Sequence, residues 1–368
     1  MRIAFYAPLK PADDPVPSGD GRIARLLLAA LQAAGHVSFV ASRLRSYDGD
    51  GEPRQQARIA EQGRAAAERL VRSWRRTPHA APQLWFTYHL YYKAPDWLGP
   101  AVAAALGIPY VVAEASFAPK RAGGVWDLGH RQVARALGLA DAVLGLNPAD
   151  RACVLPLLRD PRRWIAMRPC LDAGAYAAPR RPAGAAPRLI AVAMMRNGDK
   201  LASYRLLGAA LARLLDLRWC LNIVGAGAAR AAVEAALAPL GARVRWSGAL
   251  DAAAVAEALA AADLFVWPAI NEALGMALLE AQASGLPVVA GASGGVGGIV
   301  AAGATGLLVM PGDPAAFAAA VRTLLVDAER RAVMGEAARR KVLREHDLPA
   351  AAQCLAAALA PFERAPAA

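Results

Sequence analysis

Two glutamates with a short separation are the clearest chemical signal in the sequence. Seven residues separate Glu272 from Glu280 in the segment Asn271–Ala290, which reads NEALGMALLEAQASGLPVVA. The pattern predicts a loop that carries Glu272 after a buried strand, followed by a helix over Gly275–Ala283. Free backbone N–H groups at the start of that helix favour an anionic ligand, and the Glu280 carboxylate can accept two hydrogen bonds from vicinal ribose hydroxyls. The alternative is a helix with two solvated glutamates.

A pair of cations follows an apolar run earlier in the chain. Arg196 and Lys200 occur in Val192–Leu207, which reads VAMMRNGDKLASYRLL. We expect a strand-to-helix loop here, at the carboxyl end of a parallel sheet. Two cations on such a loop can bind a diphosphate and stabilise its charge as a sugar departs, which a metal ion does in other enzymes. The alternative is a solvated basic loop.

Small residues open the first predicted helix. Ser18, Gly19, Asp20 and Gly21 lie in PSGDGRIARLLLAALQAAGHV, directly after the first apolar run and its loop. Small residues allow a ligand to approach the backbone closely. His89 ends another predicted strand and can orient an acceptor hydroxyl or donate a proton to it. The alternatives are a glycine-containing turn and a histidine without a chemical role.

Together these segments resemble the signature of the family 4 glycosyltransferases, which are retaining enzymes with the two-domain GT-B fold. The resemblance implies that Glu272 contacts the donor sugar and that Glu280 holds the nucleotide ribose. It also implies that Leu274, Gly275 and Met276 bring backbone N–H groups to the donor.

The same resemblance assigns the phosphate contacts and the nucleotide loops. Arg196 and Lys200 match an Arg and Lys pair that binds the diphosphate. They are four positions apart here, whereas the two residues are usually five positions apart in the family. Gly225 lies in a glycine turn after a strand, and Trp246 lies in VRWSGAL, which resembles the loop beside the nucleotide base. Gly298 stands where the family often has a glutamate.

In the first half of the chain, the Ser18–Gly21 loop matches the family loop that faces the phosphates and the acceptor. Where many members have a histidine, this chain has Ala115, flanked by Glu114 and Ser116. Two interpretations are open: Glu114 or Ser116 substitutes for that histidine, or the acceptor chemistry differs.

The order of apolar runs and Ala- and Leu-rich helical stretches predicts an α/β protein with two doubly wound, Rossmann-like domains facing a cleft. We predict an acceptor-side domain over residues 1–171 and a nucleotide-sugar domain over 189–348. A stretch with three prolines and no apolar period, residues 172–188, is the predicted linker. A last helix over 349–368 is expected to cross back to the first domain.

The composition and charge of the chain limit the kinds of partner that we expect it to bind. The 368 residues carry a net charge of +12, but no nucleic-acid-binding signature accompanies it. The four cysteines have no metal-ligand spacing, and no apolar run is long enough for a signal peptide or a membrane span, so we expect a cytoplasmic protein. The segment Arg54–Arg76 has seven arginines against Glu61 and Glu68, which predicts a basic helix that contacts the anionic inner face of a membrane. An arginine-rich solvated face is the alternative.

The resemblance implies a metal-independent hexosyltransferase that moves a sugar from a nucleotide diphosphate sugar to an acceptor hydroxyl, in polysaccharide or glycolipid synthesis. The nucleotide sugar is then a substrate, the acceptor is a sugar or is lipid-linked, and no cofactor is implied. A nucleotide-sugar epimerase and a non-catalytic subunit share the fold. An NAD enzyme fits poorly because Arg230 stands at the third glycine position of the fingerprint, and Asp48–Asp50 lacks the buried strand that a metal site would need.

Overall fold

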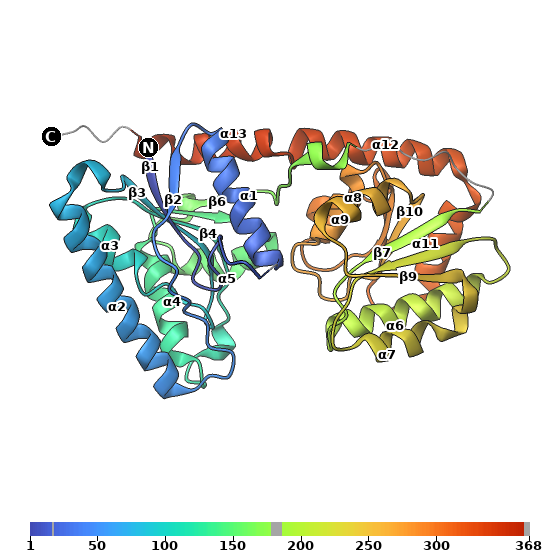
Figure 1. The fold of residues 1–368 in the computed structure, drawn as a ribbon, viewed down its shortest axis with the longest axis horizontal. Coiled ribbons are helices and arrows are strands. Elements are labelled where there is room, and N and C mark those ends of the chain that lie inside the picture. The colour runs from blue at the N-terminus through green and yellow to red at the C-terminus, as the bar shows by residue number, and fades with distance from the viewer. Residues whose placement is uncertain (17, 178–185, 364–368) are drawn as a thin grey trace. The chain divides into compact units, whose positions relative to one another are not determined.

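The computed structural model describes residues 1–16, 18–177 and 186–363. The chain divides into two compact units, one formed by residues 1–170 with the segment from Leu348 onward, the other by Leu171–Asp347. Each unit is a parallel sheet covered by helices (Figure 1). This is the α/β, Rossmann-like architecture that the alternating apolar pattern predicts.

Within the described residues, six parallel strands form the sheet of the first unit, in the order β2-β1-β3-β4-β5-β6. Their bounds are β1 Arg2–Tyr6, β2 Val37–Val40, β3 Leu84–Leu90, β4 Tyr110–Ala115, β5 Ala142–Gly145 and β6 Trp164–Ala166. The strand order reverses between β1 and β3. In open parallel sheets, ligands bind beyond the carboxyl ends of the strands at such a reversal.

The helices of the first unit are α1 Gly19–Ala33, α2 Pro53–Arg76, α3 Gly99–Leu106, α4 Asp127–Leu139, α5 Arg151–Val154 and α13 Leu348–Leu359. Although α13 comes from the end of the chain, it packs against α1 (Figure 1). Ala351, Leu355 and Leu359 are buried on α13, so apolar burial holds this last segment on the first unit.

A buried carboxylate connects β3, β4 and α3 in the first unit. Asp96 is fully buried; its Oδ1 accepts from the backbone N–H of Leu98 and Gly99 at 2.8 and 2.7 Å. Its Oδ2 accepts from the hydroxyls of Thr87 and Tyr110 at 2.5 and 3.1 Å. Because both oxygens are hydrogen-bonded, the buried carboxylate is tolerated, and it links the two central strands β3 and β4 to the start of α3.

The second unit repeats the architecture with six parallel strands among its described residues, in the order β12-β11-β10-β7-β8-β9. Their bounds are β7 Arg188–Val192, β8 Cys220–Val224, β9 Val244–Gly248, β10 Leu264–Trp267, β11 Val288–Gly291 and β12 Gly306–Val309. Numbered from β7, this is the 3-2-1-4-5-6 order of dinucleotide-binding sheets. The order reverses between β7 and β10.

The helices of the second unit are α6 Asp199–Leu211, α7 Arg230–Leu237, α8 Ala252–Ala260, α9 Met276–Ala283, α10 Val296–Ile299, α11 Pro314–Val326 and α12 Ala328–Glu345. The helix expected over Gly275–Ala283 is α9, which begins one residue later because Gly275 is its N-cap. All four residues of β10 and of β11 are buried, as expected for strands with helices on both faces.

The predicted linker, residues 172–188, is only partly described. Its early residues form a short 3₁₀ helix, Ala173–Tyr176, whose Ala173 and Tyr176 are buried in the core of the second unit. Residues 178–185 lie outside the described residues, and Arg188 begins β7.

Candidate functional site

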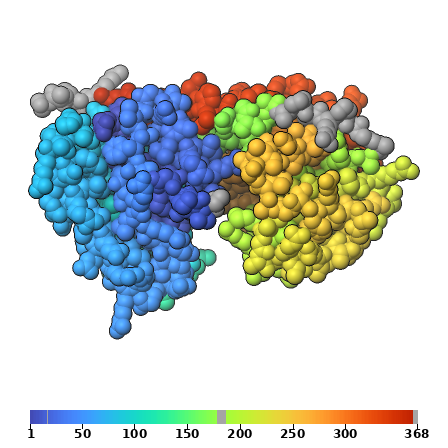
Figure 2. Space-filling model, in the orientation of Figure 1, coloured from blue at the N-terminus to red at the C-terminus, as the bar shows by residue number. Residues whose placement is uncertain are grey.

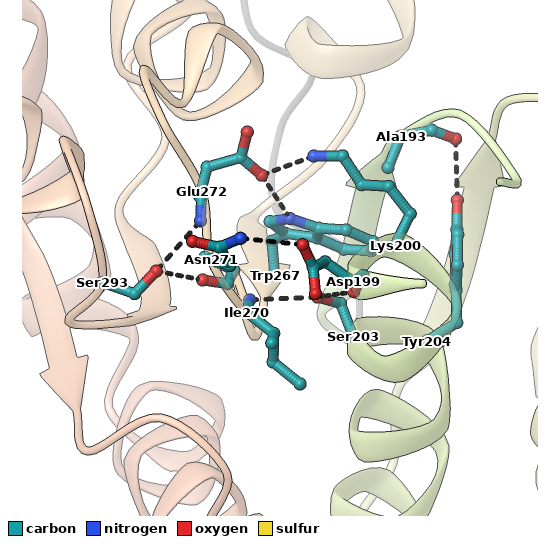
Figure 3. Close-up of polar contacts among 11 residues, drawn as sticks. Ala193, Asp199, Lys200, Ser203, Tyr204, Trp267, Ile270, Asn271, Glu272 and Ser293 are labelled. Atoms are coloured by element: carbon teal, nitrogen blue, oxygen red, sulfur yellow. Dashed lines mark hydrogen bonds and ion pairs between the residues drawn. The ribbon is translucent and has the colours of Figure 1, made fainter. Parts of the chain in front are cut away.

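The reversal point of the second sheet carries an ion pair. Lys200 lies in the first turn of α6, after β7, and Glu272 lies in the loop after β10. The Lys200 Nζ is 2.5 Å from Oε2 of Glu272, which also accepts from the Trp267 indole N–H at 3.2 Å (Figure 3). The ammonium also lies 5.5 Å from the centre of the Trp267 ring. Sequence-distant loops therefore bring the predicted diphosphate cation and donor-sugar carboxylate together.

Further hydrogen bonds hold these two loops in place (Figure 3). The Asn271 side-chain amide donates to the Asp199 carboxylate at 2.9 Å, so the loop after β10 is tied to the start of α6. The Ser203 hydroxyl accepts from the Ile270 N–H at 3.0 Å. The Ser293 hydroxyl accepts from the Glu272 N–H at 3.0 Å and donates to the Ala269 carbonyl at 2.7 Å. The loop that carries Glu272 is thus restrained on both sides.

Two residues of that loop have a left-handed backbone that is uncommon outside glycine. Ala269 has φ 53° and Asn271 has φ 51°. Such residues cost about 1–3 kcal/mol each and cluster where function requires a particular backbone. Their position beside Glu272 marks the loop as a functional segment.

Glycines allow the loops to pack without room for side chains. Gly225 has φ 147°, and a Cβ there would lie 1.9 Å from the carbonyl oxygen of Ala193. Gly294 has φ 51°, and a Cβ there would lie 2.0 Å from the carbonyl oxygen of Glu272. The first contact supports the loop of Lys200 and the second supports the loop of Glu272. Gly225, which lies five residues before Arg230 in the partial dinucleotide fingerprint, therefore has a packing role here.

Helix α9 continues from the Glu272 loop. Its N-cap, Gly275, has φ 66°; Leu274 before it is buried and Met276 after it is half-buried. Glu280 lies on α9 and is only 5% exposed. A carboxylate so far withdrawn from water contradicts the alternative of two solvated glutamates, and Glu272, with 17% of its side chain exposed, is also largely shielded.

Two of the predicted donor-side residues lie apart from this network. The Arg196 side chain is exposed and makes no hydrogen bond or ion pair with any residue that the structure describes; its carbonyl accepts from the Leu201 N–H at 3.1 Å. Trp246 lies on β9, with the Arg230 guanidinium 5.5 Å from its ring centre. Lys200 is therefore placed against Glu272, whereas Arg196 is not.

The reversal point of the first sheet carries a second cluster. His89 ends β3, and its Nδ1 lies 2.9 Å from the Asp20 carboxylate in the first turn of α1. The pairing of Tyr88 with Ala113 and of Leu90 with Ala115 places His89 opposite Glu114 on β4. His89 and Glu114 have φ 63° and 57°, so the second-last residues of two adjacent strands have a left-handed backbone.

Electrostatics connects this cluster with a further carboxylate, Asp150, which follows β5. Burial lowers the pKa of His89, but the charges of Glu114, Asp20 and Asp150 and the hydrogen bond to Asp20 outweigh burial, so its pKa lies above 6.5. Burial raises the pKa of Glu114, opposed by His89 and reinforced by the two aspartates. Burial also raises the pKa of Asp150, opposed by Ser116 and His89.

The remaining residues of the predicted acceptor loop have structural tasks as well. The Ser18 hydroxyl caps α1 by accepting from the Gly21 N–H at 3.1 Å, whereas nothing lies within 4 Å of the position of a Cβ on Gly19.

Asp48, from the rejected metal motif, is buried and closes a turn. Its Oδ1 accepts from the N–H groups of Asp50 and Gly51, both at 3.2 Å.

The sequence reasoning missed several residues of both clusters. In the second unit these are Trp267, Asn271, Asp199, Ser203 and Ser293, and in the first unit they are Tyr88 and Asp150. Trp267 and Asn271 flank the Glu272 motif, so their closeness in sequence was a signal. Nothing local marks Asp150, because its relation to His89 arises only from sheet order.

The second unit is similar in sequence to a known protein family. Residues 189–341 match the family model described as glycosyl transferases group 1. Residue identity is 43% over 97 residues with sulfoquinovosyl transferase SQD2 of Arabidopsis thaliana, covering 26% of this chain and 19% of that protein. It is 35% over 199 residues with the D-inositol 3-phosphate glycosyltransferase of Geodermatophilus obscurus, covering 49% of this chain and 44% of that one. The chain thus spans less than half the length of these curated relatives.

Solved structures resemble the whole chain. A sucrose-phosphate synthase from Thermosynechococcus elongatus superimposes with a TM-score of 0.73 at 21% identity, covering 100% of both chains. Anabaena HepE in complex with UDP-glucose superimposes with a TM-score of 0.70 at 16% identity, covering 98% of this chain and 100% of that one. The protein therefore has the GT-B fold, and the match to the glycosyl transferases group 1 model lies within its second unit.

Gly294→Ala tests the close contact behind Glu272. A methyl group at φ 51° and 2.0 Å from the Glu272 carbonyl must displace that loop, so we expect a loss of about 1–3 kcal/mol in unfolding free energy. Denaturant unfolding measures it. Gly298→Ala is the matched control, since nothing lies within 4 Å of its Cβ position. Equal stability of the two variants would contradict the packing argument.

The pKa of His89 tests the first-unit cluster. NMR titration of the imidazole, assigned with His89→Ala, is expected to give a pKa above 6.5. Asp20→Asn and Glu114→Gln should each lower it, because each removes a negative charge that stabilises the imidazolium. A wild-type pKa at or below 6.5 would show that burial dominates and that the carboxylates do not act on His89.

Proposed function

We propose that this protein is a glycosyltransferase that moves a sugar from a nucleotide diphosphate sugar to an acceptor hydroxyl with retention of configuration. The observation that carries the proposal is the Lys200–Glu272 pair at the reversal point of the second sheet, next to the start of α9. In this proposal Lys200 is the cation that binds the diphosphate, and Glu272 beside it is the carboxylate that binds the sugar. The family assignment of residues 189–341 supports the same reaction class.

Lys200 and Glu272 have complementary roles in this proposal. Lys200 leaves Glu272 for the diphosphate and stabilises the charge that grows on it as the sugar departs. Glu272 then accepts hydrogen bonds from sugar hydroxyls, while Trp267 continues to hold its Oε2. Glu280 accepts the ribose hydroxyls. Arg196, with its exposed side chain, adds a second cation that binds only when the donor is present.

The transfer itself forms one bond and breaks another. The acceptor oxygen bonds to the anomeric carbon, and the bond from that carbon to the diphosphate breaks with its electron pair remaining on the diphosphate. The acceptor proton passes to the leaving phosphate oxygen. His89, held by Asp20, orients the acceptor hydroxyl. We propose that no metal ion is needed, because Lys200 supplies the charge.

Glu280→Ala is expected to weaken nucleotide binding. Loss of a charged hydrogen-bond acceptor for the ribose costs about 1.5–3 kcal/mol, or roughly tenfold to a hundredfold in Kd. UDP is the first nucleotide to test because HepE was solved with UDP-glucose, and calorimetric titration measures the affinity. Glu257→Ala, on the exposed face of α8, is the control. Unchanged UDP affinity in a folded Glu280→Ala variant would remove Glu280 from the site.

Lys200→Ala is expected to reduce turnover about a hundredfold or more, whereas a strong chelator leaves it intact. The donor is first identified by thermal stabilisation with a panel of nucleotide sugars, and turnover is followed by release of the nucleoside diphosphate. Lys200→Arg should retain part of the activity because it keeps the charge. Activity that disappears with chelator and returns with magnesium or manganese would refute metal independence. Nucleotide binding without turnover would instead indicate a non-catalytic subunit.

The basic helix of the first unit suggests a membrane contact. Ile59 and Trp74 of α2 are buried, so its large apolar side chains face the core, and the seven arginines of this helix are exposed. Figure 2 shows the light-blue α2 side chains along one side of the first unit. None of the described helices has both the length and the apolar character needed to cross a bilayer. We propose a peripheral, electrostatic contact with anionic lipid, consistent with a lipid-linked acceptor.

Sedimentation with anionic vesicles tests this contact. Each cation near the surface contributes about 1 kcal/mol, so Arg64→Gln/Arg69→Gln should weaken binding roughly thirtyfold at low salt. Moderate salt should release the wild-type protein, since no apolar face inserts. Arg218→Gln/Arg330→Gln removes the same charge from exposed sites of the second unit and is the control. Absence of binding to anionic vesicles at low salt would refute the contact.

A further inference from the structure

A small cavity lies within the first unit. Its volume is about 10 Å³, roughly the space that one water molecule needs. Four segments that are distant in the sequence contribute to its walls: the loop after β2, helix α2, the loop after β3 and helix α4. Polar side chains in the lining include Ser46, Asp48, Gln56 and Lys93. A ligand in this cavity would therefore connect segments that only the fold brings together.

Two acceptor atoms in the lining are buried and unpaired. Oδ2 of Asp48 and Oε1 of Gln56 make no hydrogen bond with any residue that the structure describes, and both residues are only 6% exposed. The Gln56 amide is fixed in its orientation because its Nε2 donates to the Val125 carbonyl at 2.7 Å. Buried polar atoms nearly always have a partner, so these two oxygens indicate a ligand that donates hydrogen bonds.

Lys93 brings a donor to the same cavity. Its Nζ donates to the Gly49 carbonyl at 2.9 Å and lies 4.5 Å from the centre of the Trp126 ring. An ammonium group has three N–H donors, so Lys93 can donate to a ligand as well. The Lys93 carbonyl accepts from the Asp48 N–H at 2.8 Å, which keeps the two residues adjacent.

The charges in the lining distinguish between ligands of this size. A monovalent cation would be attracted by Asp48 but repelled by the Lys93 ammonium. Among the described residues, no group of three or more His, Cys, Asp and Glu is arranged to hold a metal ion. A water molecule is neutral, donates two hydrogen bonds and accepts others. It therefore matches two acceptors and one donor, and about three hydrogen bonds are usual for a buried water.

We propose that this cavity binds one water molecule, which donates to Oδ2 of Asp48 and Oε1 of Gln56 and accepts from Nζ of Lys93. The water fastens α2 to the loops after β2 and β3. The loop after β3 also carries Tyr91, whose ring stacks on His89 with centroids 4.9 Å apart, so the water helps to hold the segment beside that histidine. This inference goes beyond the proposed function, because it concerns the interior of the first unit and holds whatever reaction the protein catalyses.

A crystal structure of the full chain, at a resolution that shows ordered water, tests the site directly. We expect a single density peak within hydrogen-bonding distance of Oδ2 of Asp48 and Oε1 of Gln56. A crystal soaked in a thallium(I) salt should show no anomalous signal at this peak. An empty cavity would overturn the proposal, and so would a thallium signal, because it would identify a site for a monovalent cation.

A double-variant cycle tests the same site in solution by denaturant unfolding. Asp48→Asn and Gln56→Met each disturb the water, so each should lower the folding equilibrium constant about tenfold. Because both variants disrupt the same ligand, the double variant should lose clearly less than the product of the two effects. Asp50→Asn, an exposed carboxylate in the same loop, is the control and should change little.

If the two effects simply multiply in the double variant, no shared ligand joins Asp48 to Gln56 and the proposal is wrong. If the variants fail to fold, the density in the wild-type crystal still decides.

Discussion

The second unit depends on backbone contacts too close for any side chain. Gly225 and Gly294 lie against the carbonyl oxygens of Ala193 and Glu272, with 1.9 and 2.0 Å between each oxygen and the position of a Cβ. Close-packed segments of this kind cannot move independently, because any shift would create overlap or a void. The packing of the loops therefore brings Lys200 and Glu272 within reach of each other, at 2.5 Å. The left-handed residues Ala269 and Asn271 show the conformational cost of the same arrangement.

In both units, the cluster of polar side chains lies where the strand order of the sheet reverses. In the first sheet, α1 follows β1 on one side and β3 ends on the other, so Asp20 and His89 meet there. In the second sheet, the loops after β7 and β10 leave from the two strands that flank the reversal, so Lys200 and Glu272 meet there. The helices that would otherwise cover the carboxyl ends turn to opposite faces of the sheet at these points. One topological rule thus accounts for both clusters.

The two clusters differ in the charges that they bring together. The second unit combines Lys200, the exposed Arg196 and the start of α9 with the carboxylates of Glu272 and Asp199. The first unit gathers Asp20, Glu114 and Asp150 around His89, and burial raises the pKa of Glu114 and Asp150. A phosphate would be repelled there. The two clusters therefore differ in electrostatic character: lysine and arginine side chains lie in the second unit's cluster, whereas three carboxylates act on one histidine in the first.

Sequence alone was enough for features that local patterns encode. Buried apolar runs and glycine turns predicted α9 to within one residue, the doubly wound sheets and the place of Glu272 after a buried strand, because these depend on residues close along the chain. It could not reveal that Lys200 pairs with Glu272, 72 residues away, or that Asp150 acts on His89. Those relations depend on strand order, which is decided by packing of the whole sheet. The left-handed backbone of Glu114 is likewise imposed by tertiary contacts, since glutamate does not favour it.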